Sequence, residues 1–169
     1  MRESKPLVLI IDDDPKIREG LSRRLRCDEF AIATAASGAE AMPLVRSKAV
    51  AVVLCDERMP GQSGISVLSA IRDQSPSTVR MMLTGAPCVS LALRAINTAG
   101  VYHFFTKPCD TQELALSIRD AIRYHKTIYE SRLAGAKYPP ARRRVEACAS
   151  ESQVAYELSL DEEHDTEGS

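Results

Sequence analysis

The sequence has no C-x-x-C pair and no cluster of histidines. A zinc site needs closely spaced cysteines or histidines, and a disulfide framework needs cysteines that recur in pairs. Five cysteines do occur, but they are scattered, at positions 27, 55, 88, 109 and 148. This pattern argues against both kinds of site and favours reduced thiols in a cytosol.

A long hydrophobic run is also lacking near the start of the chain. Residues 1–6 lead into only five apolar residues, and three aspartates follow them. Such a run is too short for the core of a signal peptide or for a membrane span. We therefore expect a cytoplasmic protein that does not associate with membranes.

Neither sign of charge is in large excess. The formal net charge is -1 and the isoelectric point is about 6.3, so the chain lacks the overall basic field that gathers nucleic acid phosphates. One basic cluster, residues 142–144, has no aromatic platform or recognition helix beside it. We expect no direct DNA binding.

The sequence does contain short apolar runs that end on carboxylates. Residues 52–55 are followed by Asp56, and residues 7–11 are followed by Asp12 and Asp13. A β-branched run without polar alternation is typical of a strand buried on both faces. Because ligands of open α/β sheets bind beyond the carboxyl ends of the strands, these three aspartates are candidate site residues.

The alternation of apolar runs with helix-like segments continues along the chain and predicts an α/β fold. Short loops between the segments indicate βαβ units, hence a flavodoxin-like (βα)5 doubly wound parallel sheet with strand order 2-1-3-4-5. At 169 residues the chain is long enough for one such domain and a tail. The predicted strands are residues 7–11, 30–34, 52–56, 79–83 and 101–106, and the predicted helices are 16–25, 39–47, 65–74, 89–99 and from 111 onward.

This strand order brings four strand ends to one rim of the sheet, and with them Asp12, Asp13, Asp56, Thr84 and Lys107. Three adjacent carboxylates repel one another unless a cation neutralises them, and Mg²⁺ is the hard, oxygen-binding cation that suits them. Asp56 can then attack a phosphorus centre to form an acyl phosphate. The Lys107 ammonium and the Thr84 hydroxyl can neutralise phosphoryl oxygens.

At this point the chain resembles the receiver domain of two-component response regulators. The resemblance covers roughly residues 5–125. It rests on four motifs: Ile-Asp-Asp-Asp-Pro at 11–15, Asp-Glu-Arg-Met-Pro-Gly at 56–61, Leu-Thr-Gly at 83–85 and Phe-Phe-Thr-Lys-Pro at 104–108.

The resemblance implies a role for each matching residue. Asp56 would be the phosphoacceptor, Asp12 and Asp13 would bind the metal together with Asp56, and the backbone carbonyl of Arg58 would complete the metal site. Thr84 and Lys107 would contact the phosphoryl group, and Phe104 stands at the position of the switch aromatic.

The resemblance also implies that the donor would be a sensor histidine kinase or phosphotransfer protein, and that the protein would catalyse only its own phosphorylation and dephosphorylation. Family members vary at the positions of Arg58 and Ala86, so the phosphate lifetime does not follow from the motifs.

Two other functions share part of this pattern. A flavin-binding flavodoxin-like module has the same fold, but it needs hydroxyls and glycines after the first strand, where this chain has three carboxylates that would repel a flavin phosphate. An aspartyl-phosphate phosphatase of the haloacid-dehalogenase type also uses an Asp nucleophile with Mg²⁺. It would show Asp-x-Asp, whereas Arg58 occupies the second position here.

The chain after the receiver-like part carries no recognisable output domain. Residues 126–134 prolong the last helix with heptad-like spacing, and residues 135–169 are expected to form a disordered tail that is first basic and then acidic. Output is therefore expected through contacts with a downstream protein or a second copy. We expect that face to comprise the fourth helix, the fifth strand and the fifth helix, about residues 89–133, and to tighten when Phe104 turns inward on phosphorylation.

One backbone feature is also predicted. The ammonium of Lys107 must turn back into the site just where the chain leaves the fifth strand. A cis peptide before Pro108 makes that reversal at a cost of about 0.5–1 kcal/mol, and the receiver resemblance implies the same isomer.

Overall fold

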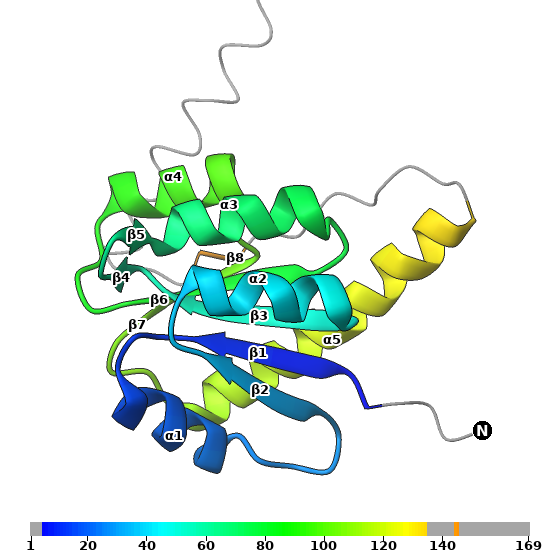
Figure 1. Cartoon of the computed structure of the whole chain (residues 1–169), viewed down its shortest axis with the longest axis horizontal. Coiled ribbons are helices and arrows are strands. Elements are labelled where there is room, and N and C mark those ends of the chain that lie inside the picture. Colours follow the sequence, from blue (N-terminus) through cyan, green and yellow to red (C-terminus); the bar gives the residue numbers. More distant parts are fainter. Residues whose placement is uncertain (1–4, 135–143, 146–169) are drawn as a thin grey trace, which may run out of the picture.

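A computed structural model describes residues 5–134 and 144–145 (Figure 1). One parallel sheet holds six strands in the order β2-β1-β3-β6-β7-β8, and β4 and β5 form a separate antiparallel pair. The strands are β1 (Leu7–Ile11), β2 (Ala31–Ala35), β3 (Val50–Asp56), β4 (Arg58–Met59), β5 (Gln62–Ser63), β6 (Val79–Thr84), β7 (His103–Thr106) and β8 (Arg144–Val145). The helices are α1 (Pro15–Arg24), α2 (Gly38–Ser47), α3 (Gly64–Gln74), α4 (Val89–Ala99) and α5 (Thr111–Leu133).

The five expected strands lie in the expected order, so the prediction of a flavodoxin-like 2-1-3-4-5 sheet is confirmed. Strand β3 lies near the centre, and all seven of its residues are buried. That is why its sequence shows no polar residue before the final aspartate. The hairpin β4–β5 and the sixth strand β8 were not predicted.

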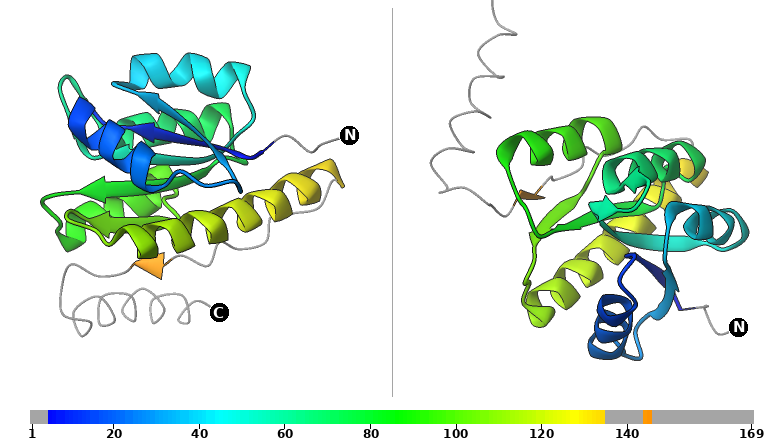
Figure 2. Two further views of the ribbon diagram at one scale, coloured as in Figure 1. Left: turned by 90° about the horizontal axis from the view of Figure 1, so that it is seen from below. Right: turned by 60° about the vertical axis from the view of Figure 1, so that its left-hand side comes forward.

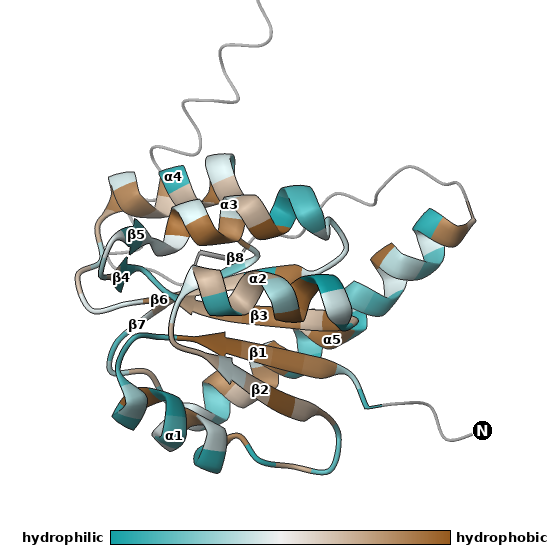
Figure 3. Cartoon of the chain, viewed as in Figure 1, coloured by the Kyte–Doolittle hydropathy of each residue, from teal (hydrophilic) through white to brown (hydrophobic). Residues whose placement is uncertain are grey.

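Helices cover both faces of the sheet, with α2, α3 and α4 on one side and α1 and α5 on the other (Figures 1 and 2). Successive strand residues point to opposite faces, and the packing follows this rule on β3 and β7. Val53 and Phe104 lie in the cluster under α2, α3 and α4, whereas Leu54 and Phe105 lie in the cluster under α5. Figure 3 shows the resulting pattern, with hydrophobic central strands β1 and β3 and helices in which hydrophobic and hydrophilic residues alternate.

The helix boundaries follow local signals in the sequence. The side chains of Ser37, Ser63 and Asp110 cap α2, α3 and α5 by accepting hydrogen bonds from backbone N–H groups. Gly100 ends α4 with φ 59°, a left-handed conformation that glycine adopts without strain. Helix α1 begins at Pro15, one residue before the predicted start, with Asp14 as its cap.

The last helix continues to Leu133, as the heptad-like spacing predicted. Ile128 of this extension is buried, whereas Tyr129 and Leu133 are exposed. Residues 144–145, within the segment expected to be disordered, form β8. The other residues of that segment lie outside the described part of the chain. None of the helices among the described residues is both long and apolar enough to cross a membrane.

Candidate functional site

Three of the predicted site residues meet at the carboxyl ends of β1, β3 and β7. The Nζ atom of Lys107 lies 2.8 Å from Oδ2 of Asp12 and 2.5 Å from Oδ1 of Asp56. Both aspartates are buried, with 2% and 6% of their surface exposed. A buried carboxylate is costly unless it is paired and hydrogen-bonded, so one ammonium here compensates two otherwise unfavourable charges.

Asp12 is held by the backbone on either side of it. Its N–H donates to the carbonyl of Ala35 at 3.2 Å, and its Oδ1 accepts from the N–H of Asp14 at 2.9 Å. The Arg18 guanidinium donates to the Asp12 carbonyl at 2.5 Å and to the Asp13 carbonyl at 3.0 Å. The acidic loop is thereby fixed to the first turns of α1.

Asp56 is fixed by the turn that follows β3. Its Oδ2 accepts from the backbone N–H of Arg58 at 2.8 Å, and the N–H of Glu57 donates to the Leu83 carbonyl at 3.0 Å. The start of α3 packs directly on this turn, because a Cβ added to Gly64 would lie 2.2 Å from the Asp56 carbonyl oxygen. Only glycine allows this approach.

Lys107 reaches the site from the loop after β7. Its N–H donates to the Thr84 carbonyl at 2.7 Å, and the peptide bond to Pro108 is cis, as predicted. Burial lowers the pKa of the Lys107 ammonium, but its hydrogen bonds and ion pairs with Asp12 and Asp56 outweigh burial and leave the pKa above its ordinary value. Lys107 is therefore a permanent cation at neutral pH.

Thr84 and Phe104 lie behind this charge cluster. Thr84 is 1% exposed, and its hydroxyl accepts from the N–H of Ala86 at 3.2 Å. Phe104 is 2% exposed and belongs to the hydrophobic cluster that includes Ala92 and Ala95 of α4. In this structure the ring is therefore inward.

Asp13 is the predicted carboxylate that the described structure does not bring into the ion-pair cluster, and its side chain is exposed. In the described part of the chain, no group of three His, Cys, Asp or Glu side chains is arranged to hold a metal ion. The ammonium of Lys107 lies between Asp12 and Asp56 instead. The donor chemistry still fits Mg²⁺, which binds through one or two carboxylates and waters, because the carboxylates of Asp12 and Asp56 both lie at this rim.

Sequence reasoning missed several residues that shape the site. Arg18 follows the acidic loop by little more than one helical turn, a spacing that could have suggested its contacts. The Cys55 thiol donates to the Asp56 carbonyl at 3.2 Å, and Oε2 of Glu57 accepts from the Ile65 N–H at 3.1 Å. No spacing rule predicts these two contacts, because the first comes from strand geometry and the second from how α3 packs.

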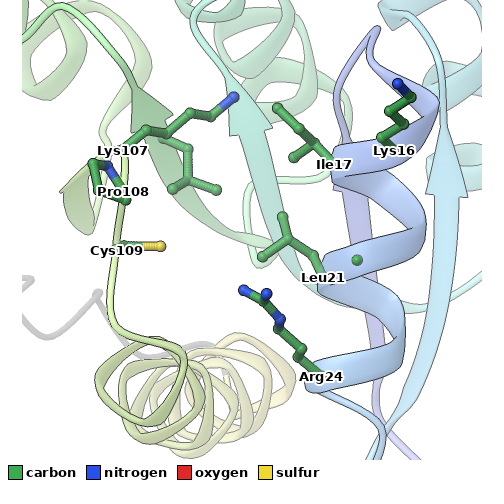
Figure 4. Close-up of a pocket in the computed structure, with 9 residues that line it drawn as sticks. Lys16, Ile17, Leu21, Arg24, Lys107, Pro108 and Cys109 are labelled. Atoms are coloured by element: carbon green, nitrogen blue, oxygen red, sulfur yellow. The ribbon is translucent and has the colours of Figure 1, made fainter.

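A cleft opens beside the charge cluster, between α1 and the loop from β7 to α5 (Figure 4). Its volume is about 340 Å³. Figure 4 shows Lys107, Pro108 and Cys109 on one side, facing Ile17 and Leu21 of α1 on the other. The cleft is thus a largely apolar groove that ends at the Lys107 stem and is also lined by Lys16 and Arg24 of α1.

Comparison with known proteins decides between the three functions considered above. The family model of the response regulator receiver domain matches residues 8–119. This chain belongs to the response regulator receiver domain family. Its role is that of a phosphoacceptor in two-component signalling, and neither the flavin-binding nor the phosphatase alternative stands. Receiver domains generally bind Mg²⁺ and interact with histidine kinases or phosphotransfer proteins.

Among curated proteins, the receiver is similar to larger regulators. It is 31% identical over 128 residues to the hydrogenase transcriptional regulatory protein HoxA of Bradyrhizobium diazoefficiens, a match that covers 76% of this chain and 26% of HoxA. It is 33% identical over 116 residues to the probable transcriptional regulatory protein TcrX of Mycobacterium tuberculosis, covering 69% of this chain and 49% of TcrX. The chain thus spans between a quarter and a half of these relatives.

Solved structures show the same fold. The signal receiver domain of an HD domain-containing protein from Pseudomonas fluorescens Pf-5 is 32% identical, with a TM-score of 0.70 over 73% of this chain and 98% of that one. The beryllofluoride-activated NtrC4 receiver domain, described as a dimer, is 28% identical, with a TM-score of 0.66 over 70% of this chain and 98% of that one.

Proposed function

We propose that Asp56 is the residue of this receiver that accepts the phosphoryl group. The observation that carries the proposal is the single ammonium of Lys107 in contact with both Asp56 and Asp12 at the carboxyl end of the sheet. A carboxylate held between a fixed ammonium and the backbone N–H of Arg58 is oriented for attack on phosphorus. Residues 5–125 form the functional unit in this proposal, and 126–134 its helical extension.

In the reaction, an oxygen of Asp56 forms a bond to phosphorus while the bond between phosphorus and the imidazole nitrogen of the donor breaks. The leaving imidazole takes up a proton from solvent. Lys107 stays protonated throughout, because its pKa is raised, and its ammonium can follow the developing charge onto a phosphoryl oxygen. The Thr84 hydroxyl donates to a second oxygen. The protein catalyses only this modification and its reversal.

Mg²⁺ is the cofactor in this proposal. Asp12, Asp13, Asp56 and the backbone carbonyl of Arg58 would hold it, and when bound it neutralises phosphoryl oxygens. The buried position of Asp12 and Asp56 favours a cation there, since like charges in one crevice repel. The Asp13 carboxylate is exposed, so it would be accessible to such an ion.

The phosphodonor is a sensor histidine kinase or a phosphotransfer protein. Asp56 is only 6% exposed, so a donor imidazole must approach along the rim of the sheet. The cleft between Ile17 and Pro108 ends at Lys107 and supplies an apolar contact surface beside that rim. We place the donor there, in the cytoplasm.

The output surface comprises α4, β7 and α5. Phosphorylation would give the Thr84 hydroxyl a strong acceptor and would tighten the inward position of Phe104. Because Phe104 contacts the cluster that includes α4, its position is transmitted to that helix. A downstream protein or a second copy of the chain binds this surface, without direct DNA binding.

Asp56→Asn tests the assignment. We expect no labelling by a small-molecule phosphodonor, while Asp73→Asn, an exposed aspartate on α3, is labelled like the wild type. Asp and Asn side chains are nearly equal in size, so the circular dichroism spectra of both variants should match that of the wild type. Labelling of the Asp56 variant, or labelling that survives chelation of divalent metal, would exclude this site.

A further inference from the structure

The outer edge of β7 carries a feature that phosphorylation chemistry does not use. Strand β8 lies parallel to β7, with His103 in register with Arg144 and Phe104 in register with Val145. It is the sixth strand of the main sheet and comes from far along the chain (Figure 2). An edge strand presents backbone N–H and C=O groups that pair readily with another chain unless they are covered.

The β7 edge lies between two helices. On one face of the sheet Phe104 packs in the cluster with Ala92 and Ala95 of α4, and on the other Phe105 packs in the cluster with Leu114 of α5. A strand on this edge therefore lies in the middle of the α4–β7–α5 surface. Another strand that pairs with the outer edge of β7 must therefore displace β8.

The edge continues beyond β8 as a groove. A cavity of about 250 Å³ runs along the carboxyl half of β7 and the start of α5. Its lining residues are Phe104, Phe105, Thr106, Pro108, Cys109, Asp110 and Glu113. The surface next to β8 is thus hollowed in the direction in which a longer parallel strand would run.

We propose that the β7 edge is a strand-docking site whose resident occupant is this chain's own C-terminal segment around Arg144–Val145. The segment acts as a tethered competitor. Nine residues, 135–143, join it to Ala134 at the end of α5, so its pairing with β7 is intramolecular and does not depend on protein concentration. Backbone pairing over two residues is weak, so an external strand can exchange with it.

Peptide competition on the full chain tests this proposal. Val145→Pro removes the backbone donor at 145 and disfavours pairing, and Val154→Pro is the control outside β8. A labelled peptide of residues 140–150 should bind the Val145→Pro protein on the order of tenfold tighter than the wild type or the control, because only that variant leaves the edge open. The same peptide with Pro at 145 should bind neither protein.

Hydrogen exchange locates the contact. Amides of residues 103–106 should exchange faster in Val145→Pro than in the wild type, with β1 and β3 unchanged as evidence that the core is folded. Protection at 103–106 should not depend on protein concentration. The proposal is overturned by equal peptide binding to all proteins, by no binding to Val145→Pro, or by protection that rises with concentration, since the last outcome assigns the strand to a second copy.

Discussion

Strand β7 takes part in two regions that are held together by different interactions. At its carboxyl end, the chain delivers Lys107 to Asp12 and Asp56, and the contacts are charge pairs between particular side chains. At its outer edge, β7 meets β8 through backbone pairing, which most residue types can make. The first region depends on residue identity and the second on backbone geometry. Side-chain substitutions should therefore weaken the first region more than the second.

The largest effect is expected from Lys107→Met. This change leaves two carboxylates buried without their cation, and removing one partner of a buried ion pair costs about 3 kcal/mol of the free energy of unfolding. Mg²⁺ should restore part of the loss, because a divalent cation can take over the compensation. Urea unfolding with and without Mg²⁺ measures both effects.

Two further variants sharpen that result. Lys126→Met, at an exposed position of α5, should unfold like the wild type. Asp12→Asn combined with Lys107→Met should be more stable than Lys107→Met alone, since one of the uncompensated charges is gone. If Lys107→Met unfolds like the wild type, the ion-pair cluster does not contribute to stability.

A smaller effect is expected from Gly64→Ala. The added Cβ would lie 2.2 Å from the Asp56 carbonyl oxygen and 2.9 Å from Cα of Glu57, both backbone atoms that move only with the whole turn. Overpacking of this kind costs about 1–3 kcal/mol, and the shift of the turn should also slow phosphorylation of Asp56. Thermal unfolding and the labelling rate report the two consequences.

Gly20→Ala in α1 is the matched control for Gly64→Ala. No heavy atom lies within 4 Å of its added Cβ, and alanine in a helix interior is favoured over glycine by about 0.5–1 kcal/mol. Gly20→Ala should therefore raise the unfolding temperature. If Gly20→Ala and Gly64→Ala lowered the unfolding temperature equally, the loss would not come from the contact of Gly64 with the turn, and α3 would not pack on the turn as tightly as described.

The same contrast explains what the sequence could predict. Asp12, Asp56, Thr84 and Lys107 follow apolar runs, so strand order alone predicts that they share one rim. The strand β3 was recognised because burial on both faces leaves an uninterrupted apolar pattern. The cis bond at Pro108 was also anticipated, whereas Phe104 was expected to turn inward on phosphorylation and is already buried without it.

The features that were missed have no local signature. Strand β8 is two residues long and pairs through its backbone, so nothing in Arg144–Val145 marks it as a strand. Likewise, the position of the Lys107 ammonium between the two aspartates depends on the conformation of its side chain, which the sequence does not determine. Charge repulsion predicted a cation at this place, and in this structure the protein itself supplies it.

A modest effect should connect the two regions. The N–H of Lys107, the residue that follows β7, donates to the Thr84 carbonyl at 2.7 Å, and Phe104 of β7 is in register with Val145 of β8. Beryllofluoride, which mimics the phosphoryl group, should therefore increase hydrogen exchange at residues 103–106 by a few-fold through a small shift of β7. Asp56→Asn should show no response. A response in that variant would mean that the reagent acts elsewhere.

The last effect is expected only at alkaline pH, within the site itself. Burial, and after it the charge of Asp56, raises the pKa of the Cys55 thiol well above its usual value of about 9. Below about pH 8 the thiol is protonated in both the folded and the unfolded chain, so it adds no pH dependence. Above pH 9 the unfolded chain releases the proton while the folded chain keeps it. The free energy of unfolding should therefore fall, by at most about 1.4 kcal/mol per pH unit.

Cys55→Ser isolates this contribution. A serine hydroxyl can still donate to the Asp56 carbonyl, as the thiol does at 3.2 Å, but it does not titrate in this range. Lys107 destabilises both proteins equally as pH rises above its usual pKa of 10.5, because its own pKa is raised in the folded state. The difference between wild type and Cys55→Ser in chemical unfolding should thus change between pH 8 and pH 10 and stay constant below pH 8. Parallel curves across the whole range would mean that the thiol beside Asp56 is accessible to water and hydroxide.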